Sequence, residues 1–276
     1  MPELLTDPLP GVEARPDDAH YAILDQGAHV LAWQPAGHRP VLWVSTRSAF
    51  RPGAAVRGGI PVVFPWFGKG PDGDRTPPHG YGRIVDWQRE DVTEQDGHLR
   101  ATYRLAARDG FPSALLTADF RTARLDVQLT IVNDTDAAVT VEAALHTYFA
   151  VGDIHQVSID GFDQANYVDT VVGADPGPFV QQGPITFSAE TDHTYRHNGT
   201  AVLHDPVWNR MITVAKNGSE STVVWNPWID KSASMADFGD DEWLQMVCIE
   251  AANVRDSALH LAPGTAHTMG QTITVT

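Results

Sequence analysis

The sequence contains one cysteine, Cys248, and only three lysines, Lys69, Lys216 and Lys231, in 276 residues. A single cysteine excludes an internal disulfide, and its place in an apolar run predicts a buried, inert thiol. A lone thiol suits a reducing compartment. The first residues carry no basic segment followed by an apolar one, so there is no sign of a secretory leader. We therefore expect a cytoplasmic protein.

Long apolar runs and an excess of positive charge are also missing. No stretch approaches the about 20 consecutive apolar residues of a membrane-spanning helix. The 35 acidic residues outnumber the 19 basic ones, which gives a net charge of −16. A chain with this charge is a poor partner for nucleic acid or an anionic membrane, because both attract a basic surface. We expect neither as a partner.

The motifs of several common sites are absent. The 12 histidines and the cysteine show no zinc-ligand spacing, and no glycine-rich phosphate loop or serine-hydrolase elbow occurs. The sequence therefore offers no support for a metal or a nucleotide cofactor.

Short alternating runs of apolar and polar residues are the main structural signal. Residues 125–131 alternate strictly, residues 133–136 form a turn signal, and residues 139–143 begin another such run. This pattern predicts a hairpin of a half-buried antiparallel sheet. Helical periodicity is scarce, 42% of the residues are hydrophobic, and 23 glycines and 19 prolines punctuate the runs. We expect an all-β fold, a large antiparallel β-sandwich that forms one domain over residues 1–276.

Three segments place polar and aromatic residues where a plain strand would not. They are residues 57–68, 77–83 and 144–149. Gly58 and Gly59 would let the backbone of the first segment pass close to another group. An isolated histidine such as His146 is most often a structural residue, so by itself it proves no site. A carboxylate that follows the apolar residues 247–249, as Glu250 does, must be paired, hydrogen-bonded or functional.

Positive charge gathers in one part of the chain. Five basic residues lie within residues 51–83 against Asp72 and Asp74, a local balance of +3; they are Arg51, Arg57, Lys69, Arg75 and Arg83. Such a region could bind an anionic group, most simply a phosphate. The alternative is that these side chains pair with the acidic remainder of the surface.

Taken in order, these segments resemble the motifs of the aldose 1-epimerase (mutarotase) superfamily, and most of all its hexose-6-phosphate mutarotase branch. The resemblance rests on residues 57–61, 64–68, 79–83, 145–149, 191–192, 224–228 and 247–253. Tyr81 and Gly82 depart from the usual Phe-Ala of the second motif. The residues after Asp192 also depart from the family pattern, so Asp205 stays open as the alternative to Asp192.

The resemblance implies the fold, the reaction and the site. The fold would be a galactose-mutarotase-like β-supersandwich, and the protein would act on a small-molecule sugar phosphate without metal or cofactor. A protonated His146 would be the general acid and an ionised Glu250 the general base. The substrate-binding residues would be Arg57, His79, Arg83 and Asp192. We further expect a monomer.

Two further interpretations stay open alongside a hexose-6-phosphate mutarotase. One is an aldose 1-epimerase for unphosphorylated sugars, and the other is a non-catalytic carbohydrate-binding protein with the same fold. For a mutarotase, we expect His79, His146 and Glu250 to open into one cavity. Arg57 and Arg83 would then lie at its wall or rim and would be the best candidates for holding the phosphate, with Lys69 and Arg75 further out as helpers.

Overall fold

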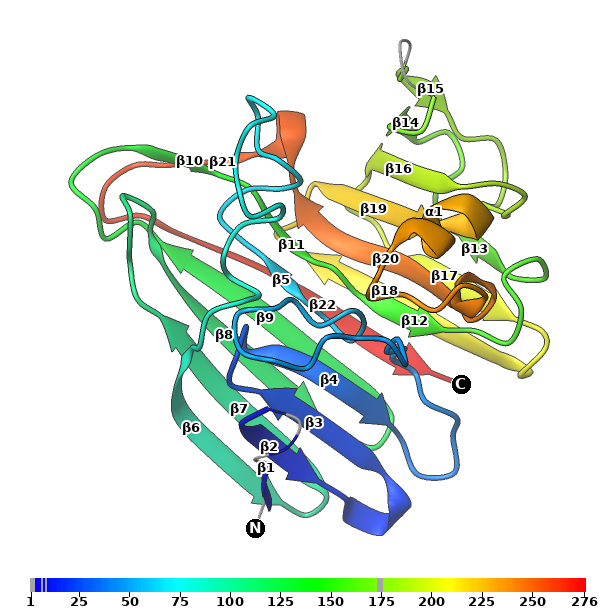
Figure 1. Ribbon diagram of the computed structural model, residues 1–276, viewed down its shortest axis with the longest axis horizontal. Coiled ribbons are helices and arrows are strands. Elements are labelled where there is room, and N and C mark those ends of the chain that lie inside the picture. The colour runs from blue at the N-terminus through cyan, green and yellow to red at the C-terminus, as the bar shows by residue number, and fades with distance from the viewer. Residues whose placement is uncertain (1–2, 6, 8, 173–175) are drawn as a thin grey trace.

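The computed structural model describes residues 3–5, 7, 9–172 and 176–276, and these form mostly antiparallel strands (Figure 1). Helices are few in this part of the chain: one α-helix, α1 (Trp228–Ser234), and three short 3₁₀ turns at Pro16–Asp18, Glu242–Gln245 and Arg255–Ser257. No described helix has the length and hydropathy needed to span a bilayer. The expected all-β class is confirmed.

One eight-stranded sheet forms the first layer of the sandwich. Its strands, in spatial order, are β13 (Ser158–Asp160), β17 (Ala201–Asp205), β18 (Arg210–Asn217), β22 (Ala266–Val275), β9 (Arg124–Val132), β8 (Ser113–Phe120), β7 (His98–Leu105) and β6 (Gln88–Gln95). Strand β9 shows the expected alternation. Its buried side chains are Leu125, Val127, Leu129 and Ile131. The period-2 pattern therefore identified a strand with one face in the core.

The hairpin expected between residues 125–131 and 139–143 is wrong. Strand β9 pairs with β8 and β22, whereas β10 (Val139–Val141) pairs with β21 (Leu259–Leu261). The turn carries the chain away from the first sheet, because the buried Asn133 side chain donates to the carbonyl oxygens of Ala137 and Leu261. An alternating pattern defines a strand but not its partner.

The second layer consists of two sheets. A four-stranded sheet joins β1 (Glu3–Leu5), β2 (Gly11–Ala14), β3 (His20–Leu24) and β4 (His29–Gln34). A second eight-stranded sheet has the order β15 (Phe179–Val180), β14 (Asn166–Asp169), β16 (Thr191–Arg196), β19 (Ser221–Asn226), β20 (Met246–Asn253), β11 (Ala143–Leu145) and β5 (Val62–Val63), and β12 (Tyr148–Ala150) also pairs with β20.

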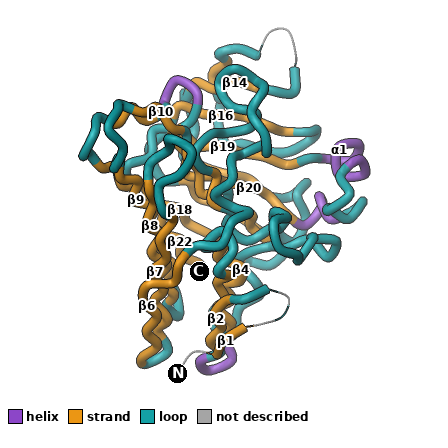
Figure 2. Tube along the Cα trace, turned by 60° about the vertical axis from the view of Figure 1, so that its left-hand side comes forward, coloured by secondary structure: helices purple, strands orange, loops and turns teal. Residues whose placement is uncertain are grey.

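A continuous apolar core lies between the layers. Figure 2 shows the two layers edge-on, with β6–β9 on one side and β2 and β4 on the other. The Tyr21 ring of β3 stacks on the Phe120 ring of β8 with centroids 5.6 Å apart. Every residue of β20 is buried, Cys248 among them, so the expected buried thiol is confirmed. The central strand of the second layer is thus covered on both faces.

Gly58 and Gly59 let residues 57–68, the first of the three polar and aromatic segments, pass through a narrow space beside β4. Gly59 has a φ of +61°, and a Cβ atom there would lie 2.3 Å from the carbonyl oxygen of Val30. A Cβ atom at Gly58 would lie 2.4 Å from the Cα atom of Val44. These contacts confirm the close backbone approach expected from the two glycines.

We expect Gly59→Ala to lower the free energy of unfolding by roughly 3 kcal/mol or more, because left-handed strain and a steric clash act together. Gly53 is a matched control: its φ is +77°, but a Cβ atom there would meet no other atom within 4 Å. Gly53→Ala should cost only about 1–2 kcal/mol of strain. Urea unfolding of both variants tests this, and equal losses would contradict it.

Candidate active site

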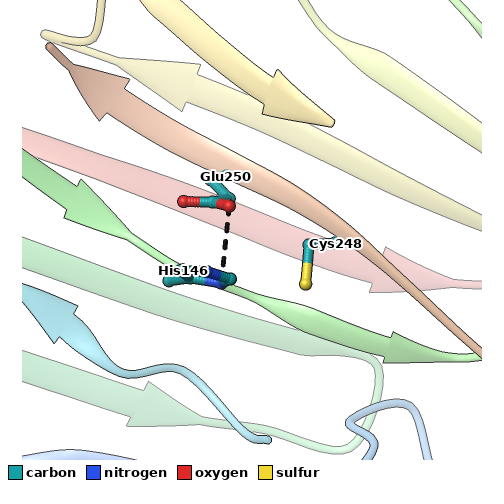
Figure 3. A group of neighbouring side chains, drawn as sticks. All are labelled: His146, Cys248 and Glu250. Atoms are coloured by element: carbon teal, nitrogen blue, oxygen red, sulfur yellow. Dashed lines mark ion pairs between the residues drawn. The ribbon is translucent and has the colours of Figure 1, made fainter. Parts of the chain in front are cut away.

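The register of the second layer sets His146 opposite Glu250. Strands β11 and β12 both pair with β20, with Leu145 opposite Ala251, and the register is unchanged where β12 begins. This register places His146 across from Glu250, and opposed residues of an antiparallel pair point to the same face. The His146 Nδ1 atom lies 3.4 Å from Glu250 Oε1 (Figure 3).

The same face continues across the next two strands. Glu250 is opposite Val223 of β19, and Trp225 of β19 is opposite Asp192 of β16. This face forms the floor of a cavity of about 880 Å³. Five of the six predicted site residues line the cavity: Arg57, His79, His146, Asp192 and Glu250. The structure therefore brings these five together from distant parts of the sequence.

His79 reaches the cavity from a loop rather than a strand. Its backbone has a φ of +65°, and its N–H donates to the carbonyl oxygen of Gly68 over 2.6 Å. The Gly68 N–H in turn donates to His79 Nδ1 over 3.3 Å. Because Nδ1 accepts, we assign the ring proton to Nε2, which can donate to a ligand. The His79 ring lies 5.8 Å from the His146 ring, centroid to centroid.

Arg57 is already engaged with protein groups. Its Nε and Nη2 atoms donate to Asp237 Oδ2 over 3.2 and 3.0 Å, and its Nη1 atom donates to Tyr148 Oη over 2.9 Å. The Tyr148 ring stacks on the His146 ring with centroids 4.8 Å apart and an interplanar angle of 8°. The row Asp237–Arg57–Tyr148 therefore holds the plane of the His146 imidazole.

Arg83 is the predicted site residue that does not line the cavity. Its Nη2 atom donates to the carbonyl oxygen of Pro78, in the same loop, over 2.9 Å. Its buried Nε atom has no hydrogen-bond partner among the described residues. Burial lowers the pKa of Arg83 to about 10, although Tyr148 opposes the shift. Its charge nevertheless acts on the site, because Arg83 helps to lower the pKa of His79 and of His146. Its expected place at the wall or rim of the cavity stays a prediction.

The two candidate aspartates, Asp192 and Asp205, lie in different parts of the structure. Asp192 lies on the cavity, where burial raises its pKa. Asp205 is elsewhere, fully buried beside Arg210, with its carboxylate oxygens accepting from the backbone N–H groups of Gly152 and Trp208. Its hydrogen bonds belong to the fold, so Asp192 is the aspartate that can meet a ligand in this cavity.

Burial sets the charge states of the central pair. Burial, then His79 and Arg83, lowers the pKa of His146 well below its usual value. Burial, then Asp192, raises the pKa of Glu250 well above its usual value. Both directions favour the neutral forms, whereas the family resemblance implied an imidazolium and a carboxylate. Desolvation outweighs the mutual attraction here because both groups are withdrawn from water. Burial lowers the pKa of His79 to about 3, so it is neutral as well.

Glu142, a buried carboxylate that no sequence motif pointed to, links two walls of the cavity. Glu142 Oε2 accepts from the Phe67 N–H over 2.9 Å, and Oε1 accepts from the Arg255 N–H over 2.7 Å. In the sequence it is a glutamate at the end of an alternating run, which is ordinary for an exposed position. Glu142 therefore positions the two loops without being a candidate for the reaction itself.

Unpaired positive charge lines the outer cavity. Neither Lys69 nor Arg75 forms an ion pair with the residues that the structure describes, and both line the cavity. The Arg75 guanidinium lies 5.3 Å from the ring centroids of both Trp66 and Phe111. This aromatic wall orients a cation that stays available to an anionic ligand.

A cavity on a two-layer β-sandwich, with a histidine and a glutamate facing each other at its floor, is the arrangement of a mutarotase-type protein. The family model described as "Aldose 1-epimerase" matches residues 13–274. The chain belongs to the aldose 1-epimerase family.

Within that family, the chain is similar to several named proteins and solved structures. Proteins named "Putative glucose-6-phosphate 1-epimerase" from Escherichia coli and Salmonella typhimurium are 35% and 34% identical, over 82% of this chain in each case and 77% and 76% of theirs. A crystal structure of a Salmonella typhimurium protein titled "putative mutarotase" superposes with a TM-score of 0.88 at 29% identity, covering 99% of this chain and 92% of that one. The galactose-mutarotase-like fold expected from the sequence is confirmed.

We expect Asp237→Ala to destabilise the protein by roughly 2 kcal/mol, because Arg57 would remain as a largely buried cation without its counter-ion. The matched control is Asp240→Ala, in the same segment. Asp240 pairs with Arg47, but both side chains are more than half exposed, so its loss should cost under about 1 kcal/mol. Equal destabilisation of the two variants in urea unfolding would contradict the burial argument.

Proposed function

We propose that this protein interconverts the α and β anomers of an aldohexose 6-phosphate, with glucose 6-phosphate as the substrate to test first. The observation that carries the proposal is the His146–Glu250 pair, 3.4 Å apart on the floor of one cavity. A general acid and a general base at this separation can both reach one pyranose ring. Family membership and the names of the relatives support the same reaction.

The reaction needs one proton removed and one delivered. Glu250 takes the proton of the C1 hydroxyl, His146 gives a proton to the ring oxygen, and the bond between C1 and that oxygen breaks to leave an aldehyde. Rotation about the C1–C2 bond exposes the other face of the aldehyde. Reclosure on this face, with the two proton transfers reversed, gives the other anomer.

The His146–Glu250 pair already holds the protons that the reaction needs. A neutral His146 with a protonated Glu250 holds as many protons as an imidazolium with a carboxylate. The proton that burial places on Glu250 can therefore pass to His146 across the 3.4 Å contact, without exchange with solvent. The His79 Nε2–H would donate to substrate oxygens and stabilise charge that develops on the ring oxygen.

The phosphate would bind at the outer cavity. Lys69 and Arg75 supply positive charge that no described carboxylate neutralises, whereas the charge of Arg57 is balanced by Asp237. Arg57 and Asp192 would then contact the sugar hydroxyls.

Arg83 does not itself line the cavity, but its charge acts on His79 and His146, so its contact with the substrate stays a prediction. We propose that the protein is a monomer and that it works in the cytoplasm.

Glu250→Gln and His146→Asn should each slow anomer exchange of glucose 6-phosphate by roughly 10²–10⁴-fold, because each removes one proton-transfer group. Polarimetry from a pure anomer measures the rate, and circular dichroism confirms the fold. The matched control is the conservative change Thr147→Ser. Thr147 follows His146 between β11 and β12 and does not line the cavity. This control should keep most of the rate. Near wild-type exchange in either site variant would remove that residue from its role.

Lys69→Ala and Arg75→Ala should each weaken the use of glucose 6-phosphate by roughly 10- to 100-fold in kcat/KM, because a charge-assisted contact is worth about 1.5–3 kcal/mol. Turnover of free glucose should change much less. Arg51→Ala is the charge-matched control, since Arg51 is exposed and does not line the cavity. Equal losses on both sugars would favour the alternative interpretation, an epimerase of unphosphorylated aldoses.

A further inference from the structure

A third side chain with a metal-binding atom lies next to the His146–Glu250 pair. Cys248 precedes Glu250 by two residues on β20, so both point to the same face of the strand. One ring nitrogen of His146, Cys248 Sγ and a carboxylate oxygen of Glu250 lie within 4.8 Å of one another, and Figure 3 shows the three side chains side by side. All three residues are buried.

The spacing is close to that of a zinc site. Bonds of about 2.0–2.1 Å to nitrogen and oxygen in a tetrahedron separate those two ligand atoms by about 3.3 Å. The observed distance between His146 Nδ1 and Glu250 Oε1 is 3.4 Å. A Zn–S bond of about 2.3 Å requires sulfur–ligand separations of about 3.6 Å. The three ligand atoms already lie within 4.8 Å of one another, so a modest inward shift of Cys248 Sγ would complete the site.

The ligand atoms are also unoccupied by hydrogen bonds. His146 Nδ1 and Glu250 Oε2 are buried without a hydrogen-bond partner among the described residues, and Cys248 is a free thiol. The stacked Tyr148 ring keeps the imidazole in its present plane. Buried polar atoms are normally satisfied, so two orphaned ones in neighbouring side chains indicate room for a ligand.

We infer that His146, Cys248 and Glu250 form a binding site for one Zn²⁺ ion, and that this ion inhibits the protein. Nitrogen, thiolate and carboxylate ligands suit zinc, and three protein ligands leave the fourth position open toward the cavity. On binding, the ion would release the thiol proton of Cys248 and the carboxyl proton of Glu250 to solvent, and it would occupy the lone pairs that the proposed reaction uses. The inhibition rests on the proposed function, whereas the binding itself does not.

Cobalt(II) tests the binding independently of catalysis, because a cysteine thiolate bound to Co²⁺ gives a charge-transfer band in the near ultraviolet. We expect one Co²⁺ per chain with this band, displaced by Zn²⁺. Cys248→Ser should lose the band and weaken inhibition by Zn²⁺ roughly 100-fold, each inhibition constant being measured against that variant's own uninhibited rate. Cys248→Ala serves if the serine variant does not fold.

Two results would overturn the inference. One is the absence of the thiolate band from folded wild-type protein at saturating Co²⁺. The other is equal inhibition of wild type and Cys248→Ser, which would assign the metal to exposed pairs such as His204–Asp160. If the band forms but the protein has no epimerase activity, the metal site stands and the proposed function fails.

Discussion

The antiparallel register between β20 and the β11–β12 segment is the constraint on which the site depends. It sets His146 opposite Glu250, and a slip of one residue would turn one of these side chains to the other face of the sheet. The segment is held on two sides: the His146 N–H donates to the Pro61 carbonyl, and the Gln271 side chain donates to Thr147 Oγ1. The functional pair is thus a product of sheet geometry rather than of a flexible loop.

Burial of this pair works in two ways. It makes the charged forms costly, which lowers the pKa of His146 and raises the pKa of Glu250. Burial also requires that neighbouring side chains hold both groups in place while leaving their hydrogen-bonding atoms free for a substrate. The row Asp237–Arg57–Tyr148 does this for His146, because it holds the plane of the imidazole by stacking. Glu142 fixes the cavity walls in a similar manner, through backbone N–H groups on two loops.

The sandwich could be predicted from the sequence because alternation and turn residues report directly on half-buried strands. The partner of residues 139–143 could not, since period-2 patterning carries no information about which strands meet. The pair His146–Glu250 was reached through motif resemblance, and its opposition in one register needs the folded sheet. No sequence motif pointed to Asp237, because its role depends on an ion pair with Arg57, which is distant in the sequence. The exact place of Arg83 could not be predicted, because the direction of a loop side chain depends on backbone turns that composition does not encode.

The central claim is that this cavity opens and recloses the ring of a sugar 6-phosphate. Magnetisation-transfer NMR on equilibrated sugars measures it most directly, with glucose 6-phosphate, glucose and galactose compared at equal concentration. We predict protein-dependent exchange between the anomers of glucose 6-phosphate that is much faster than for either free sugar. Exchange of glucose 6-phosphate at the uncatalysed rate in the presence of folded protein would contradict it.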